Sequence, residues 1–193
     1  MSSSDSSRSI LDRPIPKPTE VNESLFALIF AEAVRHSYQR VDNVDGLETK
    51  LSAMGFQIGW RALELVASRE KVEKRELRVV QALQHVSGTC WTQLYGRTTD
   101  SLERSTERPD TYLISEKEPL PCKYASVPRD LGRLNLAAFN AGIIQGLLVG
   151  QGYECEVTAH FAQDKSGAQK VVYVVKFDQT VMEREARLAR MGA

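Results

Sequence analysis

The chain has 193 residues, of which 42% are hydrophobic and 26% are charged, so it is long enough and apolar enough to bury a core of its own. Its 25 basic and 25 acidic side chains cancel. This balance argues against nucleic acid or an anionic membrane surface as a direct partner, because both attract proteins with a basic excess. The three cysteines are widely spaced and indicate neither a disulfide framework nor a zinc site; they are Cys90, Cys122 and Cys155.

The sequence shows no pattern of a signal peptide or of a membrane span. No charged and then apolar leader stands at the start. The longest apolar stretch, Leu134 to Gly150, is interrupted by Asn135, Asn140 and Gln145, and it falls short of a bilayer span of about 20 residues. We therefore expect a cytoplasmic protein.

The first 19 residues differ in composition from the rest of the chain. Residues 1–19 are rich in serine and then in proline, which favours an extended arm of the polyproline type. Such an arm is either a disordered tail or a segment that docks on a partner through Ile10, Leu11 and Ile15. We expect the remaining chain, residues 20–193, to form a single domain.

The first predicted helix follows Asn22, a residue type that caps helices well. Its apolar residues cover more than one face of the helix; they are Leu25, Phe26, Leu28, Ile29, Phe30, Ala33 and Val34. A helix of this kind must be covered on several sides, either by the chain's own core or by a partner. We take Phe26, Phe30 and Val34 as candidate partner contacts and leave the purely internal core as the alternative.

A second helix is predicted to start at an Asp45 cap, and its Leu51 and Met54 join the candidate partner contacts. A charged connection over residues 68–78 is expected to lead into a third helix. That helix should run to about Tyr95 and end at Gly96, because glycine is the usual residue at a helix C-cap.

The second half of the chain has mixed helix and strand patterns. Residues 97–110 are polar and predict a loop with a helical turn, and residues 111–117 predict a short strand. The prolines after it predict irregular structure or an edge strand; they are Pro119, Pro121 and Pro128. A helix is expected from about Asn135, then a hairpin over residues 155–177, then a charged helix from Gln179.

In the first strand of this hairpin, alternation predicts that one face is formed by Cys155, Val157, Ala159 and Phe161. Because helices come first and strands gather late, the pattern indicates an α+β domain with an antiparallel sheet.

Four small residues recur at every fourth position of the helix that starts near Asn135; they are Ala138, Gly142, Gly146 and Gly150. Each glycine inside a helix costs about 1 kcal/mol relative to alanine, so three of them on one face need a reason. Positions four apart form one seam, and a seam without side chains lets another backbone approach closely. We expect close packing on the sheet or on a neighbouring helix, with a glycine-lined ligand channel as the alternative.

Patterns of catalytic chemistry do not stand out. The three histidines do not stand near each other or near a cysteine at metal-ligand spacing, and no G-x-S-x-G or H-E-x-x-H motif is present. The stretch GLLVGQG is followed by no G-K-[ST], so it is a weak phosphate loop. We therefore predict no catalytic residue, no cofactor and no metal, and we expect the chain not to be an enzyme.

The stretch from Leu134 to Phe161, LNLAAFNAGIIQGLLVGQGYECEVTAHF, resembles the signature of the small core subunits of TRAPP, the transport protein particle. Three upstream stretches resemble other family elements in consistent order: Met54 to Glu70, Arg75 to Ser105 and Tyr112 to Asp130. The resemblance covers about residues 20–180. Its E-P-L and A-G-I-I elements are most similar to the class called subunit five, or the thirty-one kilodalton subunit.

The resemblance implies a helical layer packed on an antiparallel sheet, and members that pair through their first two helices and stack into a rod. It implies sister TRAPP core subunits as partners and a Rab GTPase as a partner of the assembled complex. It further implies vesicle tethering and Rab nucleotide exchange in traffic from endoplasmic reticulum to Golgi. Membrane association would be peripheral, at cis-Golgi and endoplasmic reticulum, and only through the complex. An alternative is a module of the same fold that binds an apolar small molecule.

One relative in the family carries an acylated cysteine just before an R-E-T stretch. In this sequence the matching stretch is Arg75-Glu76-Leu77, which places Lys71 where the cysteine would stand. The chain departs from the acylated relative at this position, so we expect no acyl group here.

Overall fold

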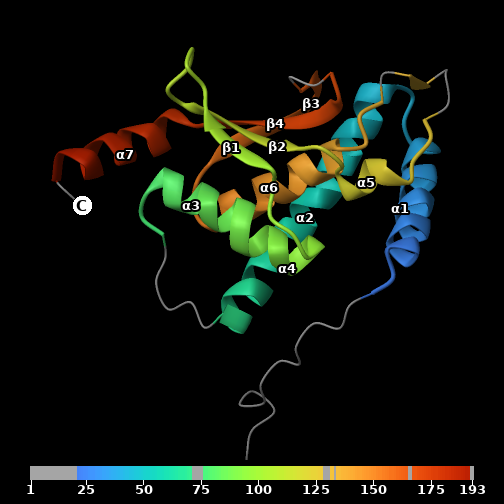
Figure 1. Ribbon diagram of the computed structural model, residues 1–193, viewed down its shortest axis with the longest axis horizontal. Coiled ribbons are helices and arrows are strands. Elements are labelled where there is room, and N and C mark those ends of the chain that lie inside the picture. The colour runs from blue at the N-terminus through green and yellow to red at the C-terminus, as the bar shows by residue number, and fades with distance from the viewer. Residues whose placement is uncertain (1–20, 71–75, 128–130, 133, 165–166, 192–193) are drawn as a thin grey trace, which may run out of the picture.

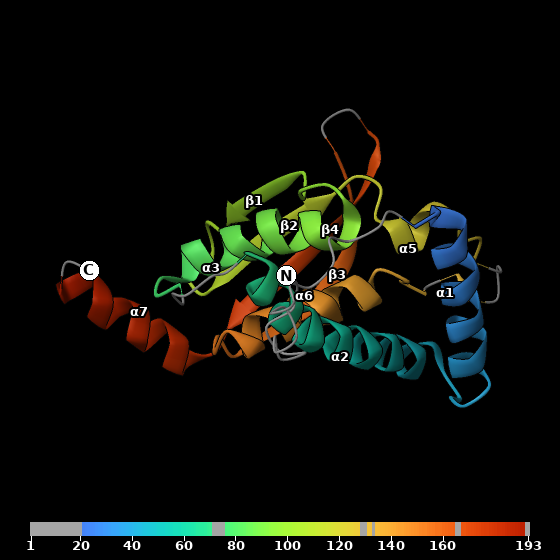
Figure 2. The same cartoon turned by 90° about the horizontal axis from the view of Figure 1, so that it is seen from below.

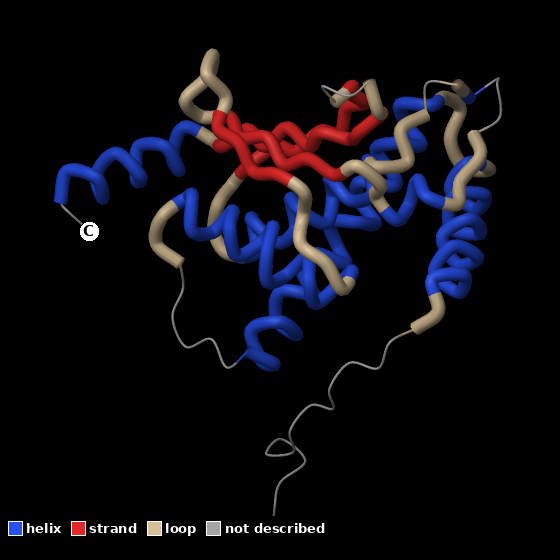
Figure 3. The backbone as a smooth tube through the Cα atoms, viewed as in Figure 1, coloured by secondary structure: helices blue, strands red, loops and turns tan. Residues whose placement is uncertain are grey.

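The computed structural model describes residues 21–70, 76–127, 131–132, 134–164 and 167–191; the predicted arm of residues 1–19, Lys71 and Pro128 lie outside this part. Within it, helices pack on one face of a four-stranded antiparallel sheet, which confirms the predicted fold class (Figures 1 and 3). The helices are α1 (Glu23–Tyr38), α2 (Val44–Glu70), α3 (Val79–His85), α4 (Trp91–Tyr95), α5 (Leu120–Lys123), α6 (Ala138–Gly150) and α7 (Gln179–Met191).

The sheet has the strand order β1-β2-β4-β3, and every neighbouring pair is antiparallel. Its strands are β1 (Ser101–Arg104), β2 (Thr111–Glu116), β3 (Cys155–Gln163) and β4 (Gln169–Phe177). The predicted hairpin is β3 and β4, in which Val157 lies opposite Val175. The β-branched run of β4 occupies an inner position of the sheet, between β2 and β3, and its alternate residues are buried.

Helix boundaries differ from the sequence-based prediction in three places. The residue that caps α2 is Asn43 rather than Asp45, because the Asn43 side chain accepts a hydrogen bond of 2.7 Å from the Gly46 amide. Helix α2 continues through Ser68 to Glu70, since charged residues are good helix formers on a solvated face. The third predicted helix reaches Tyr95 and Gly96 as expected, but a π-helical turn, Val86–Cys90, separates α3 from α4.

Two further expectations are wrong in detail, and a third is confirmed. Residues 101–104 form the edge strand β1 instead of a loop, because pairing with β2 stabilises a strand that its polar sequence does not indicate. The segment of Pro119 and Pro121 forms the short helix α5, and proline is tolerated in a first helical turn. The predicted face of β3 is confirmed, since the register partners of Cys155, Val157, Ala159 and Phe161 on β4 are all buried, although Phe161 itself is half exposed. The end of the β3–β4 hairpin extends beyond the helices (Figure 2).

Helix α6 is the centre of the molecule. It packs against α2 on one side and against β3 on another, and ten of its 13 residues are buried (Figure 2). The glycines of α6 face α2. A Cβ atom added to Gly142 would overlap the backbone oxygen of Ser52, and one added to Gly146 would overlap that of Phe56. A Cβ on Gly150 would meet side-chain atoms and no backbone: Cδ2 of Leu63 at 2.8 Å and Cε3 of Trp60 at 3.8 Å.

The glycines of α2 approach the backbone of α6 in the same way. Added Cβ atoms on Gly55 and Gly59 of α2 would overlap the backbone oxygens of Phe139 and Ile143 of α6. The two helices therefore lie backbone against backbone, with two glycines on each side of the contact. Ala138, the first residue of the small-residue row, is buried at the start of α6. A glycine-lined channel is not compatible with this geometry, since α2 fills the space along Gly142 and Gly146.

This contact predicts that a single added methyl group lowers the stability of the fold. Gly146→Ala should lower the free energy of unfolding by about 1–3 kcal/mol, because the methyl group overlaps backbone atoms and the helices must move apart. Gly88→Ala is the matched control: its methyl would meet no atom within 4 Å. That control should leave stability unchanged or raise it by up to about 1 kcal/mol. Urea unfolding of both variants measures the difference, and equal midpoints would contradict the close contact.

Candidate functional site

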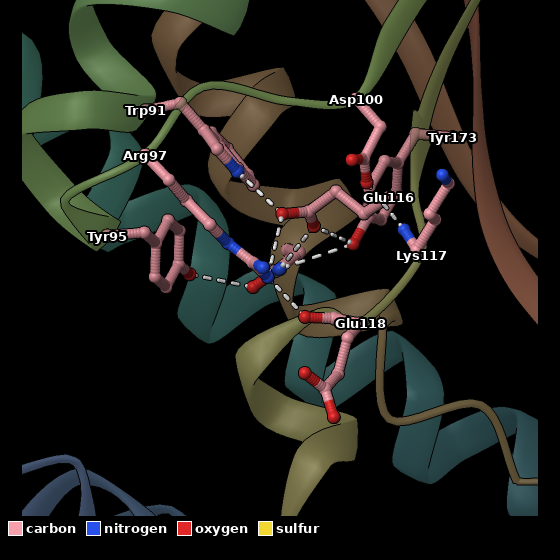
Figure 4. A network of polar contacts seen from close by, with 9 residues as sticks. Trp91, Tyr95, Arg97, Asp100, Glu116, Lys117, Glu118 and Tyr173 are labelled. Carbon is pink, nitrogen blue, oxygen red and sulfur yellow. Dashed lines mark hydrogen bonds and ion pairs between the residues drawn. The ribbon is translucent and has the colours of Figure 1, made fainter.

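A buried carboxylate connects the sheet with the helices (Figure 4). Glu116, at the end of β2, is only 2% exposed. One of its oxygens accepts a hydrogen bond of 2.8 Å from Trp91 Nε1. The other accepts bonds of 2.8 Å from the Tyr173 hydroxyl and 3.3 Å from Asn140 Nδ2. These donors come from α4, β4 and α6, so one carboxylate fixes three elements to β2.

The network extends from Glu116 toward the surface. The Tyr95 hydroxyl donates a bond of 2.7 Å to Asn140 Oδ1. Arg97, whose side chain is partly exposed, lies 3.8 Å from Glu116 Oε1 and also donates to the backbone oxygen of Glu118 (Figure 4). A buried charge is tolerated where donors and a counter-ion surround it, and Glu116 has both.

This network has the residue types of an active site but not the properties of one. Burial, followed by the nearby Glu116 carboxylate, raises the pKa of Tyr95 and the pKa of Tyr173 well above the usual range. Both phenols therefore remain protonated hydrogen-bond donors at neutral pH. The geometry indicates a structural cluster that holds the sheet on the helices, rather than an acid and base positioned for a substrate.

The cysteines do not offer a reactive thiolate either. Burial raises the pKa of the Cys90 thiol to about 12, that of Cys122 to about 11 and that of Cys155 to about 12. Thiols with such pKa values are protonated at neutral pH and are poor nucleophiles. Within the described ranges, no group of three or more histidine, cysteine or acidic side chains is placed to hold a metal ion.

The candidate partner contacts divide into two groups. Phe30 is 6% exposed and Leu51 is fully buried, so both side chains belong to the chain's own core. The rings of Phe26 and Phe30 are stacked, and Phe30 lies 5.1 Å from the ring of Phe139 on α6. Val34 and Met54, like Phe26, are partly buried against that core. The chain itself therefore covers Phe30 and Leu51, and the exposed outer face of α1 is formed by other residues.

The outer face of α1 is apolar and exposed. Leu25, Leu28 and Ile29 are 50%, 71% and 61% exposed, at the i, i+3, i+4 spacing of one helical face. The sequence contained this signal, because α1 is apolar on more than one side. Periodicity alone could not tell which side the chain's own core covers. On the next helix, α2, Ile58, Trp60 and Leu65 are also exposed. An exposed apolar helix face such as that of α1 marks an interaction site.

An apolar groove lies on another side of α1. It has a volume of about 400 Å³ and runs between α1 and the segment of α5 with the residues that follow it. Phe26, Phe30 and Val34 line one wall, and Pro121 and Leu136 belong to the opposite wall. Sequence reasoning did not find this groove, because its two walls are about 90 residues apart in the chain. In the part of the chain that the structure describes, no helix is long and apolar enough to cross a membrane.

The contribution of the buried network to stability can be tested by removing one negative charge from it and one from the surface nearby. Glu116→Gln should lower the free energy of unfolding by about 1.5–3 kcal/mol, because an amide NH₂ replaces an oxygen that accepts buried hydrogen bonds. Glu118→Gln makes the same change two residues away on the surface, where the effect should stay within about 0.5 kcal/mol. Thermal or urea unfolding compares the two variants. Similar losses in both would show that the network contributes little.

The comparison with protein families gives a match over residues 26–178 to the family described as transport protein particle (TRAPP) component. The chain is 42% identical over 179 residues to "Trafficking protein particle complex subunit 5" of Dictyostelium discoideum, covering 92% of this chain and 96% of that protein. It is 38% identical over 180 residues to the Homo sapiens protein of the same name, covering 93% of each.

Among solved structures, the fold is similar to that of trafficking protein particle complex subunit 3 from Naegleria fowleri covalently bound to palmitic acid. The TM-score is 0.66 at 16% sequence identity, and the match covers 81% of this chain and 95% of the other. A likeness at this identity concerns the fold, whereas the family match and the two relatives extend over most of the sequence. The chain therefore belongs to the transport protein particle (TRAPP) component family.

Proposed function

We propose that this chain is a core structural subunit of the TRAPP vesicle-tethering complex. The observation that carries the proposal is the exposed apolar face of α1, formed by Leu25, Leu28 and Ile29. Water-exposed side chains of this size gain about 25 cal/mol for each Å² of apolar area that a partner covers. The names of the relatives, which are trafficking protein particle complex subunits, support a partner of the same family.

The proposed partners are sister TRAPP core subunits, bound through the first two helices. A helix that presents residues at i, i+3 and i+4 is suited to pack against a partner helix or groove. The ion pair of Glu32 and Arg35, at 2.8 Å on the exposed part of α1, would lie at the edge of such an interface. Charges at an edge contribute more to partner choice than to affinity.

We infer that the role in Rab GTPase nucleotide exchange is architectural, with the chain acting as a non-catalytic member of the complex. The described side chains provide a buried structural cluster and protonated thiols, which supports a role in contact rather than in chemistry. The chain would act in the cytoplasm, in traffic between endoplasmic reticulum and Golgi. Its contact with membranes at the cis-Golgi and endoplasmic reticulum would be peripheral and through the complex.

A second candidate function is a module that binds an apolar small molecule. The groove of about 400 Å³ beside α1 favours it, because pockets for such ligands are concave and mostly apolar. Size-exclusion chromatography with and without sister subunits separates the two candidates. A chain that needs a sister subunit supports the structural role, and a stable monomer that retains an apolar ligand in native mass spectrometry supports the second.

The outer face of α1 gives the first prediction on function. Leu28→Asp should weaken binding to sister subunits by about 2 kcal/mol or more, because it places a charge in a desolvated contact. The chain's own melting temperature should hardly change, since Leu28 is exposed. Leu77→Asp, at another exposed leucine near the start of α3, is the control and should leave binding intact. Equal binding by the two variants in a pull-down would remove the α1 face from the proposed interface.

The second prediction concerns exchange. The isolated chain should not accelerate nucleotide release from a Rab, whereas the assembled complex that contains it should. An exchange factor must bind the nucleotide-free state better than the bound state, and a composite surface of several chains would do so. Release of a fluorescent nucleotide is the measurement. Full acceleration by the single chain would refute the architectural role, and equal activity of a complex that lacks it would show that exchange does not need it.

A further inference from the structure

The groove beside α1 follows the helix from Phe26 to its end at Tyr38. Its α1 wall includes Phe26, Phe30, Val34 and Tyr38, which recur at every fourth position. At 1.5 Å per residue, the distance from Phe26 to Tyr38 is about 18 Å. The groove is therefore long and narrow, and its shape suits a short extended peptide better than a compact ligand.

One end of the groove lies beside the point where the N-terminal arm joins the domain. The Glu23 carboxylate, in the first turn of α1, accepts hydrogen bonds of 2.8 Å from Lys123 Nζ and 2.6 Å from the Tyr124 hydroxyl. Tyr124 also lines the groove. The described chain begins at Val21, two residues before Glu23. Any arm that leaves the domain at Val21 therefore starts at the mouth of the groove.

The sequence of the arm fits the lining of the groove. The arm carries apolar side chains and prolines at positions 10–18; they are Ile10, Leu11, Pro14, Ile15, Pro16 and Pro18. Extended proline-rich segments bind apolar grooves with aromatic side chains, because the segment loses little conformational entropy on binding. Tyr124 and Tyr38 lie toward the two ends of this groove, and both are exposed.

We propose that residues 10–15 of this chain dock in its own groove, antiparallel to α1. Six residues in the polyproline conformation extend about 19 Å at 3.1 Å per residue, which matches the length of the groove. The five residues between this segment and Val21 are enough for the chain to reverse direction at the mouth of the groove. The groove thus has an occupant of matching length and chemistry within the same chain.

Because the linker between residues 10–15 and the domain is short, a weak affinity is sufficient for this segment to occupy the groove. A flexible linker of a few residues gives an effective concentration of about 1 mM. A segment with a free affinity of about 0.1 mM would then occupy the groove about nine-tenths of the time. Docking within the chain also explains how the apolar wall of the groove stays covered while the outer face of α1 remains free. The inference does not rest on the proposed function, because the groove and the outer face of α1 are different surfaces.

The test uses photo-cross-linking in the full chain. The photoreactive residue p-benzoylphenylalanine replaces Ile15, or Ser3 as the control. With the probe at position 15, cross-links should form within one chain, to residues 26–38, 120–127 or 134–136, and their yield should exceed the yield at position 3 about tenfold. Cross-links to a second copy, to other surfaces, or at the control yield would overturn the proposal.

A pair of variants tests whether the groove itself captures the arm. Ala31 lines the groove and is exposed, so Ala31→Arg blocks the groove without disturbing the core. His36→Arg adds an arginine to an exposed position of α1 outside the groove lining. Ala31→Arg should abolish the cross-links of the position-15 probe, and His36→Arg should preserve them. Equal yields in the two variants, with unchanged circular dichroism, would show that the arm does not lie in the groove.

Discussion

The backbone contact between α2 and α6 is the constraint on which the rest of the structure depends. Gly142 and Gly146 on α6, and Gly55 and Gly59 on α2, let the two helices approach more closely than any side chain allows. Each glycine costs helix stability, so the arrangement survives only because close packing of two long surfaces offsets that cost. The contact positions α2 on one side of α6 and leaves the other side of α6 for the sheet.

A buried polar network around Glu116 joins the sheet to this helix pair. Most contacts between the layers are apolar and do not specify an orientation, whereas the Glu116 carboxylate must meet its donors on α4, β4 and α6. A buried carboxylate that loses a hydrogen-bond donor destabilises the fold. The network is therefore compatible with few relative positions of the sheet and the helices. The glycines set how closely α2 and α6 approach each other, and the Glu116 network sets the position of the sheet on the helices.

The sequence was most informative where local chemistry decides the structure. The β-branched run of β4, the Asn22 cap and the Gly96 cap all give the elements that they predict. It was least informative where contacts between residues far apart in the sequence decide the structure. Strand β1 is polar and exists because β2 pairs with it, and nothing in its own sequence indicates this. Phe30 and Leu51, which periodicity proposed as partner contacts, are buried by residues of other elements, and their own helices do not indicate this.

The surface of α1 shows the same limit of sequence analysis. Periodicity predicted that α1 is apolar on several sides, and the structure gives these sides different surroundings. The aromatic side, with Phe30, packs on Phe139 of α6 and also forms part of the groove wall, whereas the side around Leu28 faces water. The aromatic side is held by α6, and α6 is itself positioned by the glycines that face α2. Which side of α1 is exposed therefore depends on a contact between two other helices.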